Sequence, residues 1–334
     1  MEHGEGEPAV VRQRSVGLVL GAGGVLGAAW TIGALCALEE TEGIDVRDCE
    51  PIVGTSAGAV LAALVAAGVR PADLRENQLG RPVTQGPLSG FAYDHDRATG
   101  GALPMLPRAG IGSTRLLLRA VRHPRSVTPM AAMSSVLPTG RGSLWSVRNL
   151  VEAITPAGQW STHPALWVVA MDYDTGRRVA FGRDGAPVAA LSDAVLASCS
   201  IPAWYAPVAI GGRRYIDGGT CSPTSVDLLA GLGLDRVYVL APMTSLEYDD
   251  PPSVAGRVER QFRRTVTRRM LREAAKVRAS GTQVTVLGPG RADLEAIGAN
   301  MMDPARRKAV LETSLETSTA ALGRARDDEI SWTA

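Results

Sequence analysis

The sequence predicts an α/β fold, in which a mainly parallel sheet lies between two layers of helices. Two strand-turn-helix units near the start of the chain indicate this. Residues 15–20 form a short apolar run that ends in glycines, and an apolar helical stretch follows. Residues 49–54 form a second short strand, which leads into an alanine-rich helix that opens at Ser56 and is closed by Gly68. Strands that feed helices through tight turns are expected in a parallel sheet.

The composition fits a soluble globular protein. The chain has 334 residues, of which 45% are hydrophobic and 21% are charged, and its formal net charge is +1. This near-neutral balance argues against a protein that mainly holds nucleic acid. No uninterrupted apolar run reaches the roughly 20 residues that span a bilayer. The polar, acidic start of the chain also lacks the features of a secretion signal.

The four cysteines are scattered, with neither a C-x-x-C pair nor the spacing of a metal site. This pattern indicates reduced thiols in a cytoplasmic protein, and we expect neither a metal nor a cofactor. A long helix at about 253–279 carries nine basic residues between Arg257 and Arg278, against two glutamates. Such a helix either rests on anionic lipid at the inner face of a membrane or is a solvated face in an arginine-rich chain.

The rest of the chain predicts one domain over residues 15–325, between a flexible tail at 1–14 and a C-terminal tail at 326–334. Residues 71–145 are rich in proline and glycine, with short helical pieces, and we expect an irregular insertion that forms a lid or cap over a site. The elements expected after it are strands at 165–173 and 175–182, a hairpin turning on Gly211-Gly212, a buried strand at 235–243, a strand at 282–289, and a final helix at about 303–322.

The first motif with chemical meaning is the glycine loop 21–27, GAGGVLG, which follows the first strand. Its glycines leave backbone amides facing outward at a helix N-terminus, where a phosphate or the oxyanion of an acyl transfer is stabilised. A dinucleotide site would need a third glycine at Leu26 and an acidic residue at the end of the second strand. That strand ends in Gly54-Thr55-Ser56 instead, so a dinucleotide site remains only as an alternative.

The second motif is Gly54-Thr55-Ser56-Ala57-Gly58, a G-x-S-x-G between a strand and a helix, which is typical of a nucleophile elbow. The simpler interpretation is a serine that caps the N-terminus of an alanine-rich helix. A Ser-His-Asp triad is disfavoured, because no histidine follows His163 and the earlier His95 and His123 lie in the insertion. These positions are more typical of surface or loop histidines than of a catalytic base.

The third motif is Asp217-Gly218-Gly219, at the end of a predicted strand. Taken alone it is a common Asp-Gly turn. Taken in order, the glycine loop, GTSAG and DGG resemble the motifs of the patatin-like phospholipase family. The segment SIPAWYAPVAIGGRRYIDGG, which leads to DGG, is similar to that family as well. The resemblance covers roughly residues 15–245.

The resemblance implies a patatin-like three-layer α/β/α sandwich and a serine acyl hydrolase that acts on lipid esters. It implies that Ser56 is the nucleophile, that Asp217 is its base, and that the amides of Gly23, Gly24 and Val25 form the oxyanion hole. Leu26 departs from the family, whose members commonly carry arginine or lysine at this position. The alternative is therefore a lipid-binding protein that keeps the fold with weak or no catalysis.

Overall fold

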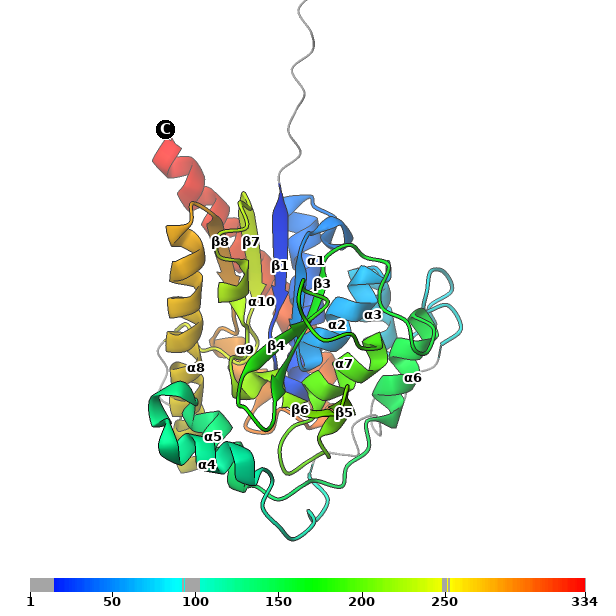
Figure 1. Cartoon of the computed structure of the whole chain (residues 1–334). Helices are drawn as coiled ribbons and strands as arrows, with labels where there is room; N and C mark the ends of the chain where they lie inside the picture. The colour runs from blue at the N-terminus through cyan, green and yellow to red at the C-terminus, as the bar shows by residue number, and fades with distance from the viewer. Residues whose placement is uncertain (1–14, 92, 94–102, 248–250, 252, 334) are drawn as a thin grey trace, which may run out of the picture.

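A computed structural model describes residues 15–333, apart from 92, 94–102, 248–250 and 252 (Figure 1). Its centre is one eight-stranded sheet with the order β5-β6-β3-β2-β1-β7-β8, and β4 pairs with β3 beside this path. The strands are β1 (Val16–Leu20), β2 (Ile52–Thr55), β3 (Leu166–Asp172), β4 (Arg178–Phe181), β5 (Val208–Ile210), β6 (Arg213–Asp217), β7 (Arg236–Leu240) and β8 (Gln283–Leu287).

The sheet is mainly parallel, as predicted. β1 pairs in parallel with β2 and β7, β2 with β3, and β7 with β8. The two hairpins predicted after residue 165 add antiparallel strands, because β3 pairs antiparallel with both β4 and β6, and β6 with β5. Parallel strands end at the same edge of a sheet, so the glycine loop after β1 and Ser56 after β2 become neighbours.

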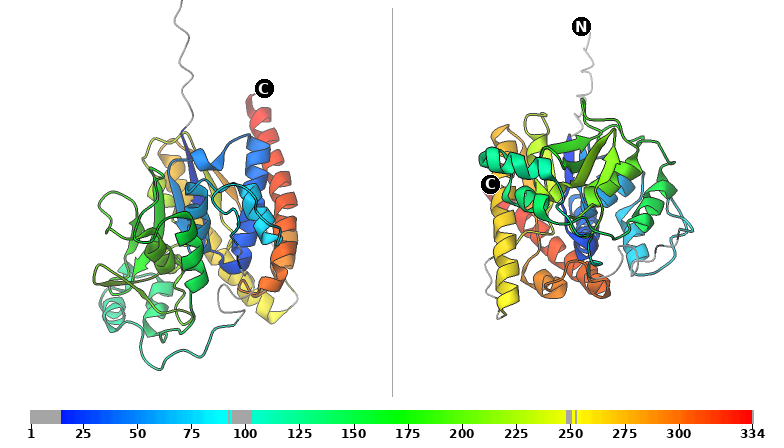
Figure 2. Two further views of the ribbon diagram at one scale, coloured as in Figure 1. Left: turned by 90° about the vertical axis from the view of Figure 1, so that its right-hand side faces the viewer. Right: turned by 60° about the horizontal axis from the view of Figure 1, so that its bottom comes forward.

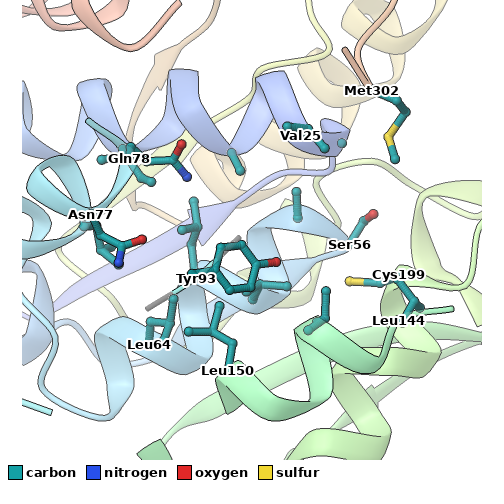
Figure 3. Close-up of a pocket in the computed structure, with 18 of the residues that line it drawn as sticks. Val25, Ser56, Leu64, Asn77, Gln78, Tyr93, Leu144, Leu150, Cys199 and Met302 are labelled. Carbon is teal, nitrogen blue, oxygen red and sulfur yellow. The ribbon is translucent and has the colours of Figure 1, made fainter. Parts of the chain in front are cut away.

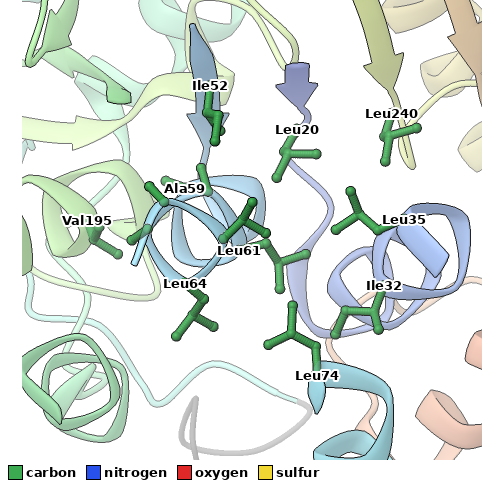
Figure 4. Close-up of a cluster of buried hydrophobic side chains, with 14 of the residues drawn as sticks. Leu20, Ile32, Leu35, Ile52, Ala59, Leu61, Leu64, Leu74, Val195 and Leu240 are labelled. Carbon is green, nitrogen blue, oxygen red and sulfur yellow. The ribbon is translucent and has the colours of Figure 1, made fainter. Parts of the chain in front are cut away.

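Helices cover both faces of the sheet, as the predicted sandwich requires (Figures 1 and 2). Leu18 and Leu20 of β1 belong to the core on one face, while Val19 between them belongs to the core on the other. This explains why β1 is apolar throughout, since strands buried on both sides do not alternate with polar residues. Figure 4 shows the larger of the two cores, where Leu20 and Ile52 meet side chains of the helices.

The larger core is formed by the helices α1 (Gly24–Glu42), α2 (Ala57–Ala66), α3 (Pro71–Gln78), α6 (Trp145–Ile154), α7 (Leu191–Cys199), α9 (Arg291–Ile297) and α10 (Arg307–Thr333). The opposite face is covered by α8 (Val254–Ala279), whose Met270, Ala274 and Val277 pack on the sheet. Among the described residues, no helix is both long enough and apolar enough to cross a membrane.

The segment 71–145 contains the short helical pieces that the sequence predicts. It begins with α3, whose Leu74 is buried in the main core, and it contains α4 (Thr114–Arg122) and α5 (Pro129–Val136). These last two helices lie across the carboxyl ends of the strands, beside the first turns of α8 (Figures 1 and 2). They are anchored by Leu116, which is fully buried, and by the Tyr173 hydroxyl, which donates to the carbonyl of Ser134 at 2.8 Å.

The C-terminal prediction is wrong in one respect. The final helix was expected to end near residue 322 and a tail to begin at 326, but α10 continues to Thr333. The sequence after Gly323 contains alanine, arginine and glutamate, which favour a helix, and no proline that would end it. The single glycine is therefore tolerated inside the helix.

Candidate active site

Ser56 sits on a sharp turn between β2 and α2. Its φ of 54° and ψ of −124° are unusual for a residue other than glycine, and backbone strain of this kind is typical of a nucleophile elbow. The small neighbours are required by space. A Cβ atom on Gly58 would lie 2.1 Å from the Leu20 carbonyl oxygen, and one on Gly54 would lie 2.5 Å from the Cα of Ala59.

Ser198, a residue for which the sequence suggested no role, holds the strained turn. The Ser56 amide donates to the Ser198 hydroxyl at 2.8 Å, and that hydroxyl donates to the carbonyl of Val169 at 2.6 Å. Ser198 is fully buried near the end of α7. It therefore ties the elbow to β3, and its only sequence signal is its place just before the SIP segment.

Asp217 lies at the end of β6, where its carboxylate meets the Ser56 side chain. Asp217 is 6% exposed and Ser56 is 4% exposed, so both groups are largely shielded from water. Burial raises the pKa of Asp217 to about 6, while hydrogen bonding from the Ser56 hydroxyl and the Gly219 amide opposes this rise. The Gly219 amide donates to the carboxylate at 2.7 Å. A carboxyl group with this pKa is ionised at neutral pH and is a better base than a solvent-exposed aspartate.

The glycine loop after β1 presents its amides at the N-terminus of α1. The amides of Ala22, Leu26 and Gly27 donate to backbone carbonyls. Within the described part of the chain, no backbone carbonyl accepts a hydrogen bond from the three amides between them, those of Gly23, Gly24 and Val25. Gly24, with a φ of 60°, and Val25 line the same cavity as Ser56. These amides are therefore available to an anion that forms beside Ser56.

Leu26, the departure from the family pattern, points away from this site. Its side chain is fully buried in the main core and its amide donates to the carbonyl of Met301 at 2.9 Å. A buried cation lies behind the same loop, because Arg263 of α8 is 2% exposed and donates to the carbonyl of Pro242 at 2.7 Å. Pro242 in turn packs directly on Gly23. Nothing in the local sequence distinguished Arg263 from the other arginines of its helix.

The Asn300–Met302 segment, to which the sequence suggested no function, covers the glycine loop. A Cβ atom on Gly24 would lie 2.8 Å from the sulfur of Met302. Met302 also lines both of the cavities that meet at Ser56. The loop is thus enclosed by residues that lie far away in the sequence.

A narrow apolar cavity of about 110 Å³ leads away from Ser56 (Figure 3). It runs between α1, α2 and α6, and its lining includes Val25, Leu64 and Leu150. The amide side chains of Asn77 and Gln78, at the end of α3, lie at the far side from Ser56 (Figure 3). The cavity is therefore apolar along most of its wall, and the two amides add polar groups on the side far from Ser56.

A wider cleft of about 1020 Å³ opens on the other side of Ser56 and Asp217. One wall is α5, with Met130 and Met133. The other is a row of α8 residues that includes Glu259, Arg263 and Glu273. That row carries both cations and glutamates, so part of the basic helix faces the site while the rest faces solvent. The two cavities meet at the paired Ser56 and Asp217 side chains.

Neither of the histidines in the described part of the chain, His123 and His163, lines these cavities. His3 and His95 lie outside the described residues. β2 ends in Thr55 with no acidic side chain, so the alternative of a dinucleotide site gains no support. The arrangement instead offers a hydroxyl, a buried carboxylate and free amides at one point.

Comparisons with known proteins identify the family. The model of the patatin-like phospholipase family matches residues 18–230. Among solved structures, the chain is similar to VipD from Legionella pneumophila, with 14% identity, a TM-score of 0.44, and coverage of 93% of this chain and 67% of VipD. It is also similar to the type III effector protein ExoU, with 17% identity, a TM-score of 0.36, and coverage of 93% of this chain and 53% of ExoU. No curated protein matches the chain. Because the family model covers more than half of the sequence, the chain belongs to the patatin-like phospholipase family, a family of lipid acyl hydrolases.

Proposed function

We propose that this protein is a serine acyl hydrolase that cleaves fatty acyl esters of lipids, of the phospholipase A or lysophospholipase type. The observation that carries the proposal is the pairing of the Ser56 hydroxyl with the buried Asp217 carboxylate, at the point where the apolar cavity meets the wide cleft. A nucleophile, its base and a place for an acyl chain are thereby brought together.

In the first half of the proposed reaction, the Ser56 oxygen attacks the ester carbonyl carbon and its proton passes to Asp217. The carbonyl oxygen becomes negatively charged and accepts hydrogen bonds from the amides of Gly23, Gly24 and Val25. The tetrahedral intermediate collapses, the carbon–oxygen bond to the alcohol breaks, and the alcohol leaves with the proton from Asp217. An acyl ester of Ser56 remains.

In the second half, a water molecule enters from the wide cleft and gives a proton to Asp217 as its oxygen attacks the acyl ester. The same amides hold the second oxyanion. The bond to the Ser56 oxygen then breaks, the fatty acid leaves, and the proton returns from Asp217 to Ser56. Because one carboxylate serves both halves, no histidine is needed.

The two cavities suggest how the substrate is divided. The narrow cavity is apolar almost throughout, so we assign the acyl chain to it. The wide cleft has room and polar groups for the alcohol part of a lipid. Since such substrates reside in bilayers, we also propose that the protein works in peripheral contact with a membrane.

The alternative is a lipid-binding protein with weak or no turnover, which the loss of a cation at Leu26 favours. Labelling with a fluorophosphonate probe separates the two functions. The hydrolase predicts labelling of the wild-type protein that Ser56→Ala abolishes and Asp217→Asn strongly slows. Ser318→Ala, which removes a buried hydroxyl in α10 away from both cavities, is the matched control and should label normally. A folded wild-type protein that stays unlabelled, while a control lipase reacts, would exclude the hydrolase.

A further inference from the structure

One segment of this chain carries many basic residues and no acidic residue. Residues 97–151 contain eight arginines and neither aspartate nor glutamate, which gives the segment a formal charge of +8. The whole chain has a net charge of +1, so the remaining residues together carry 1 − 8 = −7. The nearly neutral total therefore does not describe this segment, which is strongly cationic.

The structure places the described part of this segment on the catalytic side of the molecule. α4 and α5 lie at the carboxyl end of the sheet, where β2 leads to Ser56 (Figure 1). α5 forms one wall of the wide cleft, through Met130 and Met133. The cationic segment thus lies beside the opening through which a substrate reaches Ser56.

The same segment exposes large apolar side chains, which a solvated surface usually avoids. Leu106 is 84% exposed and Val121 is 72% exposed. The exposed large apolar residues of this segment are Leu103, Met105, Leu106, Ile111, Leu118, Val121, Met133, Val136 and Trp145. At the beginning of α8, the neighbouring helix, Val254, Val258 and Phe262 are exposed at intervals of four residues and so extend the apolar surface along one helix face.

Cations of α4 and of the short turn that follows it flank these apolar residues and are free to contact an external anion. Arg122 and Arg125 are exposed, and neither forms an ion pair with an acidic residue in the described part of the chain. Arg115 reaches Asp174 only at 3.6 Å, with its side chain 80% exposed. Leu116 points inward and anchors the helix, so the outer side of α4 combines Leu118 and Val121 with the arginines.

We propose that the outer side of α4, with the exposed apolar residues around it, docks on an anionic lipid bilayer and places the wide cleft against the membrane. Apolar side chains among arginines on one helix are the pattern of a helix that lies in the membrane interface. The arginines contact anionic head groups while Leu118 and Val121 enter the acyl boundary. The inference deepens the proposed function, because a bilayer is where its lipid esters reside, but the docking itself needs no turnover.

Sedimentation with vesicles tests the docking without hydrolysis, if Ser56→Ala is used as the background. Vesicles of phosphatidylcholine with phosphatidylglycerol are compared with vesicles of phosphatidylcholine alone. We expect binding to the anionic vesicles that weakens as salt is added. Each arginine near an anionic surface contributes about a factor of five, so Arg122→Gln with Arg125→Gln should weaken binding about 25-fold. A second variant, Leu118→Ser with Val121→Ser, should also weaken binding to the same vesicles, although these substitutions leave the net charge of the protein unchanged.

The matched control removes two arginines at the opposite end of the molecule, Arg278→Gln in the last turn of α8 and Arg324→Gln in α10. It changes the net charge equally, and Arg278, like Arg122, lies in the last turn of its helix. If the control weakens vesicle binding as much as the α4 variant, or if neither variant weakens it, the docking surface is wrong.

Hydrolysis of a short soluble ester, measured in the proteins that retain Ser56, separates this result from failure of the proposed function. We expect the α4 variants to keep that activity and to lose activity on vesicles. Normal vesicle binding without ester hydrolysis would refute the hydrolase and leave the docking surface standing.

Discussion

Replacing Asp217 with asparagine should make the folded protein more stable while it removes the proposed base. Burial raises the pKa of Asp217 from 3.8 to about 6. The ionised carboxylate is therefore less stable in the folded protein than in the unfolded chain, where water solvates it. At a pH above both values, this difference lowers the free energy of unfolding by about 3 kcal/mol, since each pKa unit corresponds to about 1.4 kcal/mol. Asparagine has nearly the same shape and carries no charge, and its side-chain carbonyl oxygen can accept the hydrogen bond from the Gly219 amide.

The sign of the pH dependence follows from proton binding. Between pH 3.8 and 6 the folded state holds a proton on Asp217 more often than the unfolded state does, so this group's contribution to stability falls as the pH rises through that interval. The gain from Asp217→Asn should therefore be about 3 kcal/mol at pH 8, about half of that at pH 5, and near zero below pH 3.8.

Urea denaturation of the wild type and the variant at pH 8 and pH 5 measures both the gain and its pH dependence. The control is Asp184→Asn, because Asp184 is an exposed loop residue whose charge should matter little. A variant that is no more stable than the wild type at pH 8 would refute the reasoning. A gain of the same size at both pH values would also refute it, since the gain would then not come from ionisation.

Four further predictions concern the same site. The rate of ester hydrolysis should rise with pH through an inflection near 6, because Asp217 must be ionised to accept the proton, and a profile that is flat between pH 5 and 7 would argue against this base. Gly58→Val should abolish folding or activity, as judged by circular dichroism and labelling, because its Cβ would lie 2.1 Å from the Leu20 carbonyl oxygen; a normal variant would show that the elbow is more open. Leu64→Phe should fill the apolar cavity and lower the activity on long-chain esters at least tenfold, relative to a butyrate ester whose hydrolysis stays constant, whereas equal losses on both would place the acyl chain elsewhere. Ser198→Ala leaves the buried Ser56 amide without its partner and should cost about 1–3 kcal/mol of stability in urea denaturation, with Ser198→Thr restoring part of it; an unchanged midpoint would show that another group supports the turn.

The parts of the site that lie in local motifs could be predicted from the sequence. Ser56, Asp217 and the glycine loop each follow a strand, and a strand end followed by small residues is a pattern that is readable within a few positions. The sheet could be predicted for the same reason, because each strand is a short apolar run next to a turn.

The remaining parts depend on contacts between distant segments. Ser198 accepts a hydrogen bond from the amide of Ser56, which lies 142 residues earlier in the sequence. Met301 is still farther in sequence from the glycine loop that it covers. Arg263 is one of several arginines on α8, and only the fold shows that its side chain is on the buried side of that helix. The sequence alone does not state which helix faces meet, so these roles follow only from the packing.

The cover of the glycine loop has a consequence for any shortened form of the protein. The family match ends at residue 230, yet β1 pairs with β7 at residues 236–240 and the Leu26 amide is held by Met301. A fragment that ends at residue 230 would keep Ser56, Asp217 and the glycine loop, and would lose the neighbours that pack on that loop. During synthesis, the loop can reach its final form only after the segment around Met301 has been made, so a nascent chain without that segment should remain unreactive toward lipid.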